Sequence, residues 1–453
     1  MYDVVVLGGG PAGYNAAQSL SENKKTVALI EQADIGGTCL NHGCIPYKTF
    51  LKSSKLYSEA KYGSNRGIVS NATTYDQSKV VSLKNQYVST LRKNIESMLD
   101  TGRVVIYRGK GEIRGITQNR LIEVIVNEEV IECQYLIICT GSSNKSTPIN
   151  FSPFKMPVMT NVEILNLEEI PANLLIIGAG VAGLEMADYF ASIGSRVTVI
   201  EKQKRIEVGL DEDIALRLQR SLMRKGAKFH FDSQIIEVGT DYIVYDKSGD
   251  TFKVEPDIVL VATGRMPNIE EIGIQSIGIE YNELGICTDL MCRTTIPNVF
   301  ACGDVNGNST FAHTAIQESF VAVNNILGNR NEMDYGIIPT IIYTSPECAI
   351  VGESEKSCEI KGIPYCVHGL PLSFSGRYFI ENAQDQSYCK LIFDSKTGIL
   401  LGCQMLGNNV SEIILSLEIA LINKMNLHQM KQIVYPHPTV GEIIGEIVRS
   451  IEL

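Results

Sequence analysis

The sequence predicts an α/β fold in which one doubly wound, parallel-sheet domain is inserted in another, followed by a separate C-terminal α+β domain. Residues 3–31 and 173–201 repeat one pattern: an apolar strand, G-x-G-x-x-G, a helical stretch and a second strand ending in glutamate. Further along the chain, each copy is followed by an apolar strand that ends in Thr-Gly. From about residue 334, short strand-like runs are followed by an amphipathic helix, which indicates the last domain.

Size and composition narrow the class of protein. A chain of 453 residues is too long for one ordinary core, so several domains are expected. The 44% hydrophobic and 20% charged content is typical of a folded globular protein, and a net charge of −11 argues against nucleic acid as a partner. No run reaches the roughly 18 apolar residues of a spanning helix, and the N-terminus enters a strand without a cleavage signal. We therefore expect a cytoplasmic protein that binds neither nucleic acid nor a membrane.

The repeat has the spacing of a dinucleotide-binding turn. The first glycine makes a tight turn, the second lets the backbone approach a pyrophosphate, and the third lets the helix lie close to the strand. The helix N-terminus then faces the phosphate charge, and the glutamate accepts hydrogen bonds from ribose hydroxyls. The landmarks recur at a constant offset of 170 residues: Gly8 and Gly178, Gly10 and Gly180, Gly13 and Gly183, Glu31 and Glu201. Two such copies predict two Rossmann-like domains.

The segments between the repeats predict how the domains are connected. Residues 143–160 contain three prolines and several serines, which is typical of a linker. After the second repeat, residues 298–304 form a strand that ends in Asp304, and residues 311–315 open a helix. Both features indicate a return to the first domain. The predicted boundaries are 1–145 for the first part of the first domain, 146–266 for the inserted domain, 267–333 for the return, and 334–453 for the C-terminal domain.

One pair of cysteines differs from the others. The chain has 12 cysteines, but only Cys39 and Cys44 form a tight pair in a glycine-rich loop, which lies directly behind the first turn. The other ten are expected to be reduced and mostly buried. Zinc ligation by this pair with His42 is an alternative, but zinc sites usually bring a second cysteine pair from elsewhere, and no other pair lies in such a glycine-rich loop. We therefore expect a redox-active pair and no metal.

Taken together, these motifs resemble those of the flavoprotein disulfide reductases from one end of the chain to the other. The matching segments, in family order, are the two glycine turns, GGTCLNHGCIPYK, ATGRMPN, FACGD, IPTIIYTSPECAIVG and HPTVGE. The resemblance implies an FAD domain interrupted by an NAD domain, a central segment and a C-terminal dimerisation domain. Tyr47 and Gly441 stand where the family usually has serine, and His42 stands where a small apolar residue is frequent. These departures concern the substrate more than the class.

The resemblance also implies the catalytic residues. Cys44 would lie against the flavin, and Cys39 would exchange with the substrate disulfide, which requires a thiolate and a nearby base. His437 of the partner subunit in a homodimer would be that base, with Glu442 fixing its tautomer. Thr439-x-x-Glu442 also has the pattern of a helix-capping box, which is the competing interpretation of the glutamate.

The expected cofactors are FAD and NAD. Lys48 and Glu185 are expected to form an ion pair beside the flavin, and Asp304 is expected to bind its ribityl chain. Glu201 favours NAD over NADP, because a carboxylate repels a 2′-phosphate. The residues expected to bind the two cofactors are Gly8, Gly10, Pro11, Ala12, Gly13, Glu31, Gln32, Gly37, Thr38, Lys48, Gly111, Thr140, Gly141, Ser142, Asp304, Ala312, Gly178, Gly180, Gly183, Glu185, Glu201 and Gly264.

Within that family the motifs are most similar to those of members that reoxidise protein-bound dihydrolipoyl groups with NAD+. Such members serve 2-oxo-acid dehydrogenase or glycine cleavage complexes, so a lipoyl-bearing protein is the expected partner. One alternative is an NAD(P)H-dependent reductase of glutathione, another small disulfide or mercuric ion. The last residues, 449–453, lack the additional cysteine pair of mercuric and large thioredoxin reductases. A mainly structural flavoprotein subunit is a further alternative, which the intact set Cys39, Cys44, His437 and Glu442 disfavours.

Overall fold

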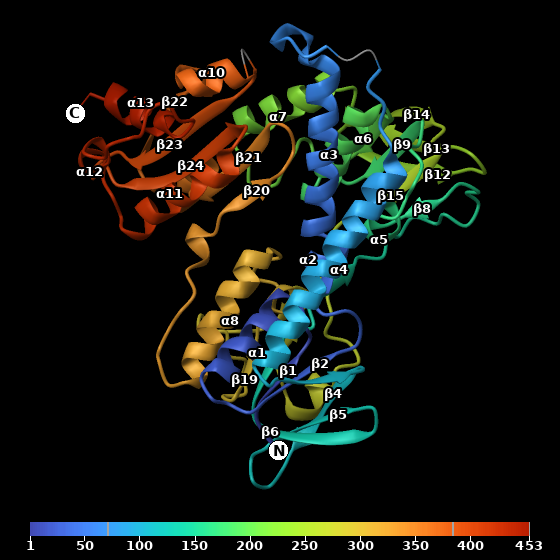
Figure 1. Cartoon of the computed structure of the whole chain (residues 1–453), viewed down its shortest axis with the longest axis vertical. Helices are drawn as coiled ribbons and strands as arrows, with labels where there is room; N and C mark the ends of the chain where they lie inside the picture. The colour runs from blue at the N-terminus through green and yellow to red at the C-terminus, as the bar shows by residue number, and fades with distance from the viewer. Residues whose placement is uncertain (70–71, 383–384, 453) are drawn as a thin grey trace. The chain divides into compact units, whose positions relative to one another are not determined.

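The structure, a computed structural model, describes residues 1–69, 72–382 and 385–452. The chain divides into two compact units, each built from segments that are separated along the sequence (Figure 1). Unit 1 comprises Met1–Thr49, Lys79–Ser146 and Gly264–Tyr335, and unit 2 comprises Phe50–Ser78, Thr147–Thr263 and Gly336–Leu453. The domain boundaries predicted from the sequence are not decided by this division and remain predictions.

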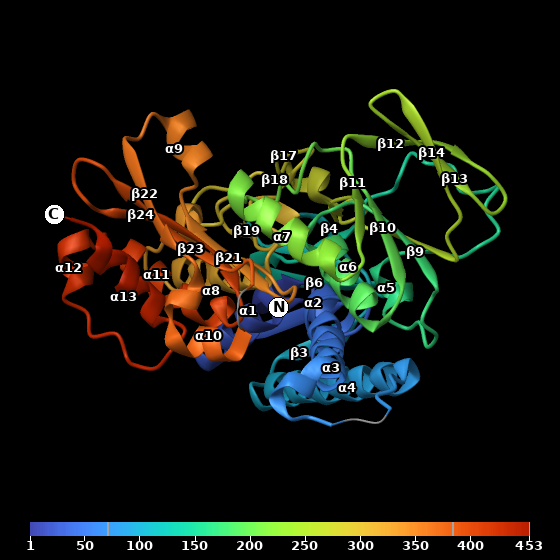
Figure 2. The ribbon, with the colours of Figure 1, turned by 90° about the horizontal axis from the view of Figure 1, so that it is seen from above.

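Unit 1 is built on a seven-stranded sheet with a parallel core. Strands β3, β2, β1 and β6 lie side by side in that order, β19 pairs with β6, and β5 and β4 extend the sheet in antiparallel fashion. The strands β1, β2 and β19 are short, mostly apolar and mostly buried, as expected for strands covered on both faces. Helices α1 and α8 pack against each other beside this sheet (Figures 1 and 2).

The elements that begin in unit 1 are, in chain order, β1 (Tyr2–Leu7), α1 (Pro11–Glu22), β2 (Val27–Glu31), α2 (Gly37–His42), α3 (Cys44–Tyr62), β3 (Val105–Arg108), β4 (Gly111–Ile116), β5 (Ile122–Val126), β6 (Glu129–Ile138), β7 (Ser142–Asn144), β16 (Arg265–Pro267), β17 (Tyr281–Asn282), β18 (Gly285–Ile286), β19 (Val299–Ala301) and α8 (Ala312–Ile326). Helix α4 (Gln77–Thr101) begins at the end of a unit 2 segment and continues in unit 1. Short 3-10 turns cover Ile274–Ile277, Asp304–Asn306 and Tyr335–Ile337.

Unit 2 contains a second parallel sheet and an antiparallel one. The parallel sheet has the order β11, β10, β9, β15, β8, and a three-stranded meander of β12, β13 and β14 accompanies it. Its elements are β8 (Val158–Met159), α5 (Asn161–Ile164), β9 (Asn173–Ile177), α6 (Val181–Ile193), β10 (Arg196–Ile200), α7 (Glu212–Arg224), β11 (Lys228–His230), β12 (Ser233–Val238), β13 (Ile243–Lys247), β14 (Asp250–Val254) and β15 (Ile258–Val261). The repeated glycine turn lies at the C-terminal end of β1 in the first parallel sheet and of β9 in the second.

The antiparallel sheet of unit 2 has the order β20, β21, β24, β23, β22, and helices α11 and α13 pack on it. Its elements are β20 (Thr340–Ile342), β21 (Glu347–Gly352), α9 (Glu355–Lys361), β22 (Tyr365–Leu370), α10 (Gly376–Asn382), β23 (Tyr388–Asp394), β24 (Leu400–Gly407), α11 (Val410–Ile422), α12 (Leu427–Lys431) and α13 (Glu442–Ser450). Further 3-10 turns in unit 2 cover Gly63–Arg66 and Leu372–Phe374.

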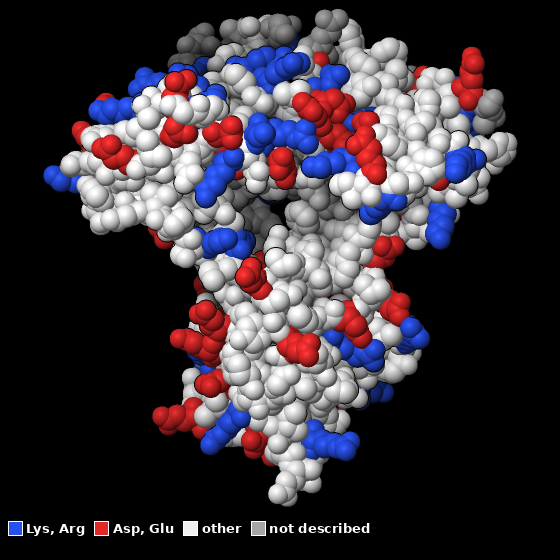
Figure 3. Space-filling model, turned by 180° about the vertical axis from the view of Figure 1, so that it is seen from behind, with Lys and Arg blue, Asp and Glu red and all other residues white. Residues whose placement is uncertain are grey.

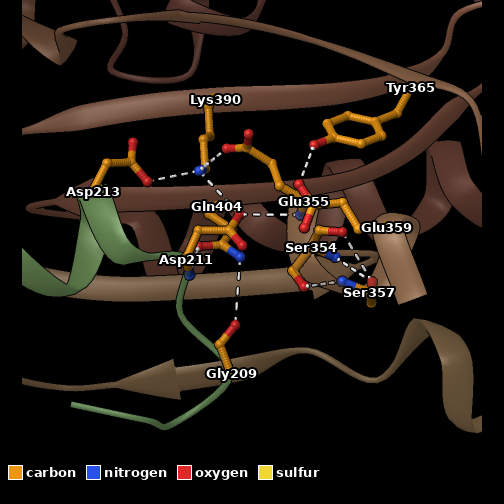
Figure 4. Close-up of polar contacts among 10 residues, drawn as sticks. All are labelled: Gly209, Asp211, Asp213, Ser354, Glu355, Ser357, Glu359, Tyr365, Lys390 and Gln404. Atoms are coloured by element: carbon orange, nitrogen blue, oxygen red, sulfur yellow. Dashed lines mark hydrogen bonds and ion pairs between the residues drawn. The ribbon is translucent and has the colours of Figure 1, made fainter. Parts of the chain in front are cut away.

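A cluster of charged residues inside unit 2 joins α7 to the antiparallel sheet. Lys390, on β23, lies within ion-pair distance of Asp211 and Asp213 at the start of α7 and of Glu355 at the start of α9 (Figure 4). Gln404, on the neighbouring strand β24, accepts the backbone N–H of Asp211 at 2.9 Å. The contacts of Lys390 with Asp213 and of Gln404 with Asp211 connect segments that lie more than a hundred residues apart in the sequence.

The predicted α/β class is confirmed, and so is the predicted strand at Tyr2–Leu7. The segment 143–160, predicted as a linker, contains two short strands: β7 pairs with β16, and β8 adds an edge to the second parallel sheet. Pairing with a distant strand stabilises these short runs despite the nearby prolines. Within the three described ranges, no helix has the length and apolar character needed to cross a membrane. On the face drawn in Figure 3, acidic and basic side chains are intermixed.

Candidate active site

The first glycine turn leaves no room for a side chain at Gly8 or Gly13. Gly8 has φ +108°, and a Cβ there would lie 2.2 Å from the carbonyl oxygen of Cys139. A Cβ on Gly13 would lie 1.8 Å from the carbonyl oxygen of Gly8. Gly10 is the N-cap of α1, and Pro11 occupies the first helical position, where no N–H is required. The N-terminus of α1 is thus bare of bulky groups, and it fits a pyrophosphate.

The second turn has the same geometry. Gly178 has φ +106°, and a Cβ there would lie 2.4 Å from the carbonyl oxygen of Ala262. A Cβ on Gly183 would lie 2.1 Å from the carbonyl oxygen of Gly178, and Gly180 is the N-cap of α6. The chain therefore offers two cradles for a dinucleotide, one in each unit.

In both repeats, the glutamate at the end of the second strand is held by backbone N–H groups. Each carboxylate accepts one bond from the residue after the first glycine and one from the residue two positions beyond the glutamate itself. Each oxygen keeps a further lone pair for a ribose hydroxyl, so both sites fit the adenosine half of a dinucleotide. The donors are Gly9 (2.6 Å) and Ala33 (2.7 Å) for Glu31, and Ala179 (2.7 Å) and Gln203 (2.9 Å) for Glu201.

Asp304 is part of a polar cluster in unit 1. It follows β19, and its carboxylate accepts a hydrogen bond from the Ser142 hydroxyl. The Nε of Arg265 lies 2.6 Å from Ser142 Oγ and 3.7 Å from Asp304 Oδ2, and Nη2 lies 3.4 Å from Thr38 Oγ1. The predicted residues Thr38, Ser142 and Asp304 thus lie together around Arg265. Sequence reasoning did not include Arg265 among the site residues. The signal was available, because Arg265 directly follows Gly264 in ATGRMPN.

The other predicted cofactor residues lie at the ends of elements. Thr140 follows β6 and donates its hydroxyl to the Asn268 carbonyl at 2.8 Å. The glycines at 141 and 264 have φ of +68° and +111°. Gln32 is exposed beyond β2, Gly111 is buried at the start of β4, and Ala312 opens α8.

The two cysteines of the tight pair form a disulfide between consecutive helices. Cys39 lies in α2, Cys44 is the first residue of α3, and their Cα atoms are 4.8 Å apart. Both residues are half-buried. A Cβ on Gly37 would lie 2.7 Å from the Cα of Gly10, so the loop that leads to Cys39 and Cys44 lies directly against the first glycine turn. Because Cys44 begins a helix of 19 residues, the helix dipole favours its thiolate once the disulfide is reduced.

Two residues that sequence reasoning missed hold this loop. The side-chain amide of Asn41 donates to the carbonyl of Gly37 at 2.9 Å and to that of Ile35 at 3.2 Å. Arg92, on α4, donates to Asn41 Oδ1 at 2.7 Å and pairs with Asp34 at 2.8 Å. Nothing local in the sequence indicates this contact between α2 and α4.

His437 and Glu442 are brought together as predicted. The Nδ1 of His437 lies 2.7 Å from Glu442 Oε2, and the side chains are 76% and 10% exposed, respectively. The competing capping-box interpretation is wrong, because α13 has no side-chain cap and the Thr439 hydroxyl donates instead to the carbonyl of Pro436. Glu442 is thus oriented toward the imidazole, and the far ring nitrogen of an exposed histidine can face a substrate. Among the described residues Glu442 Oε1 has no hydrogen-bond partner.

Glu185 is buried on α6, and its Oε1 accepts the backbone N–H of Tyr343 at 3.0 Å. Lys48 is half-buried on α3. The two residues belong to different units, and their predicted ion pair remains a prediction. Tyr47, one of the departures from the family pattern, is buried in unit 1.

Comparison with known proteins places this geometry in context. Residues 2–319 match the family model for pyridine nucleotide-disulphide oxidoreductases, and residues 338–448 match the dimerisation domain of the same family. A dihydrolipoyl dehydrogenase of Chlamydia muridarum is 32% identical over 449 residues, covering 98% of this chain and 96% of the relative. One of Geobacillus stearothermophilus is 32% identical over 450 residues, covering 98% and 95%. The HOCl-induced flavoprotein disulfide reductase RclA from Escherichia coli superposes with a TM-score of 0.87 at 25% identity, covering 100% of both chains.

Proposed function

Because this chain belongs to the pyridine nucleotide-disulphide oxidoreductase family and is an FAD-dependent oxidoreductase that uses NAD(H), we propose that it oxidises protein-bound dihydrolipoyl groups with NAD+. The observation that carries the proposal is the disulfide of Cys39 and Cys44, packed against a dinucleotide turn in a chain whose full-length relatives are named dihydrolipoyl dehydrogenases. The lipoyl group would belong to a 2-oxo-acid dehydrogenase or glycine cleavage complex, and the expected location remains cytoplasmic.

The exchange of sulfur bonds is a chemistry that the two cysteines can perform. A thiolate of the dihydrolipoyl group attacks the sulfur of Cys39, and Cys44 leaves as a thiolate. The second substrate thiol then attacks the mixed disulfide, which releases the lipoyl disulfide and reduces Cys39. Two electrons and two protons have then left the substrate, and both cysteines are reduced. When bound, FAD and NAD+ supply the two-electron chemistry that restores the disulfide.

Each attack needs a base that removes a thiol proton. The imidazole of His437 suits this role, because Glu442 holds its Nδ1 and leaves Nε2 to accept the proton. A carboxylate at 2.7 Å also stabilises the imidazolium that results. His437 lies in the segment that matches the dimerisation domain, which supports a homodimer. We propose that His437 of the partner subunit serves the cysteines of each chain.

Glu201 supports NAD as the acceptor. Its carboxylate is held by two backbone N–H groups, so it cannot easily turn away from a ligand at the strand end. A 2′-phosphate at about 4 Å from this charge would be repelled by several kcal/mol in a partly buried site. NADP is therefore expected to be the poorer acceptor.

A second candidate is the reduction of another small disulfide, such as glutathione, with a nicotinamide as donor. The similarity to RclA, which is described as a flavoprotein disulfide reductase, favours this alternative, and the departures at His42 and Tyr47 lie beside the redox pair in the sequence. A purely structural subunit is disfavoured by the His437–Glu442 contact and the formed disulfide.

A substrate panel tests the proposal. The purified holoenzyme is assayed with dihydrolipoamide and NAD+, dihydrolipoamide and NADP+, and glutathione disulfide with NADH or NADPH. We expect rapid reduction of NAD+ by dihydrolipoamide and much slower rates with the other pairs. Faster turnover of glutathione disulfide than of dihydrolipoamide would replace the first candidate by the second. Cys44→Ser, which lacks the redox pair, is the control that must lose all of these activities.

A further inference from the structure

Unit 1 contains a buried carboxylate that the proposed mechanism does not use. Glu318 lies on α8 and is 0% exposed. Its Oε2 accepts the backbone N–H of Gly303 at 2.5 Å. Its Oε1 accepts the side-chain amide of Asn306 at 3.0 Å and the hydroxyl of Tyr335 at 2.7 Å. Three donors therefore converge on one buried side chain.

Two of these donors belong to the turn that carries Asp304. Gly303 has φ +80° and precedes the 3-10 turn that runs from Asp304 to Asn306. Asn306 extends the anchoring, since its amide also donates to the carbonyl of Ala301 and its Oδ1 accepts the backbone N–H of Asn308 at 3.0 Å. Glu318 thus holds the residues on both sides of Asp304, and it leaves the Asp304 carboxylate to face Ser142 and Arg265.

A glutamate at this position is costly unless it has a specific task. Burial raises the pKa of Glu318 even though Asn306, Gly303 and Tyr335 donate to it. Replacing a buried charged network by packed apolar groups is often neutral or stabilising in proteins, so stability alone does not explain it. The turn from Gly303 to Asn306 directs its donors toward the protein interior, and these buried donors require a strong acceptor such as the Glu318 carboxylate.

We propose that Glu318 is a positioning residue for the flavin site, where it fixes the Gly303–Asn306 turn and so the direction of the Asp304 carboxylate. The inference rests on the proposed function only in taking FAD as the cofactor, with Asp304 as its predicted ligand. It does not depend on which disulfide is the substrate, so the substrate panel and the test below can fail independently.

The test is a double-mutant cycle on the affinity of the apoprotein for FAD, measured by quenching of flavin fluorescence. Glu318→Gln keeps the size of the side chain but places an amide donor where one carboxylate oxygen accepted. We expect FAD to bind about tenfold or more weakly, and Asp304→Ala to weaken binding as well. If Glu318 acts through Asp304, Glu318→Gln should add less than about twofold in the Asp304→Ala background.

Two further variants sharpen the cycle. Asn306→Ala removes one link between the turn and Glu318 without changing the glutamate, and it replaces Glu318→Gln in the cycle if that apoprotein does not fold. It should weaken FAD binding in the wild-type background and add nothing to Asp304→Ala. Tyr335→Phe removes a donor that lies outside the turn, so it should change the Kd by less than about threefold. The visible spectrum of bound flavin and the Tm of each apoprotein are recorded in parallel.

Three results would overturn the proposal. The first is an unchanged Kd for FAD in Glu318→Gln and Asn306→Ala. The second is an equal loss of affinity in the wild-type and Asp304→Ala backgrounds, which would mean that Glu318 acts only on general stability. The third is an unchanged Kd in Asp304→Ala itself, which would remove the residue through which Glu318 is proposed to act.

Discussion

The ammonium nitrogen of Lys390 lies 2.9 Å from Asp211 Oδ2, and the two side chains are 1% and 7% exposed. Asp213 and Glu355 complete the contacts of this lysine at 2.7 and 2.5 Å (Figure 4). Burial lowers the pKa of Lys390, but the hydrogen bonds that it donates to Asp213, Glu355 and Asp211 outweigh this effect, and the net pKa is raised. The lysine is therefore charged at physiological pH and holds the start of α7 on the antiparallel sheet of unit 2.

Replacing Lys390 by methionine should destabilise the protein by about 3–5 kcal/mol, because Asp211 would stay buried without a counter-charge. Urea unfolding at pH 7 measures the loss. Lys361→Met is the matched control, since Lys361 pairs with Glu353 while 55% exposed, and it should cost less than about 1 kcal/mol. Equal losses in the two variants would contradict the central role of Lys390. Because the folded pKa is raised, the stabilisation is present below the unfolded pKa and disappears as the pH rises through the folded one.

The carboxylate of Glu442 should matter for turnover through the orientation of His437. His437→Gln should lower kcat/KM with dihydrolipoamide by about 10²- to 10⁴-fold, which is the usual effect of losing a general base. Glu442→Gln should lower it by a smaller factor, because the base remains but its charge partner is lost. Glu446→Gln, on the exposed side of the same helix, is the control and should leave kcat/KM unchanged. If Glu442→Gln lost all activity while His437→Gln kept the kcat/KM of the wild type, the two roles would be reversed.

Mixed dimers should recover activity that neither parent variant has. Cys44→Ser and His437→Gln are refolded together in equal amounts, and random pairing makes about half of the dimers mixed. In a mixed dimer one site collects both lesions and the other none, so roughly a quarter of all sites should be intact. Mass spectrometry confirms that mixed dimers form. If they form and activity stays at the level of the parents, the base acts within its own chain.

Substitution by alanine at two glycines near the His437–Glu442 pair should change the stability of the protein in opposite directions. Gly441 has φ −66° and ψ −17°, and a Cβ there would meet only Ile413 at 3.9 Å and Thr439 at 4.0 Å. Gly441→Ala should therefore stabilise the protein by about 0.4–1 kcal/mol through the unfolded state. A Cβ on Gly445 would lie 2.6 Å from the ring of Tyr435, so Gly445→Ala should cost about 1–3 kcal/mol. Thermal unfolding checks both signs, and a stabilised Gly445→Ala would show that the Tyr435 ring moves freely.

Cys39 should react with iodoacetamide much faster than the buried thiols Cys133 and Cys358 in the reduced native protein. Burial raises the pKa of Cys133 to about 12 and that of Cys358 to about 11, so both remain thiols at pH 8. At pH 8 a pKa of about 12 leaves on the order of 10⁻⁴ of the thiol as reactive thiolate. Peptide mass spectrometry should show Cys39 modified within minutes and Cys133 unmodified after hours, with all cysteines modified after denaturation. Equal rates for Cys39 and Cys133 would contradict this difference.

The sequence by itself determined the features that arise from local backbone chemistry. Both glycine turns, the strands before them and the glutamates after them follow from steric rules over about 30 residues, and a repeat at constant offset identifies them twice. The cysteine pair is recognisable for the same reason, since Cys39 and Cys44 lie within one loop. The His437–Glu442 contact was a prediction with a competing interpretation, because the same spacing also suits a cap.

Only the tertiary structure decided the contacts between residues far apart in the chain. Arg265 contacts Ser142 across a separation of 123 residues, and Arg92 contacts Asn41 across 51 residues. Lys390 contacts Asp213 across 177 residues and also pairs with Asp211. Neither propensity nor periodicity encodes such pairs, because a polar side chain on a helix or strand is equally compatible with solvent. Its partner is selected when the sheets pack and water is excluded, since a buried charge or amide must then find a complementary group.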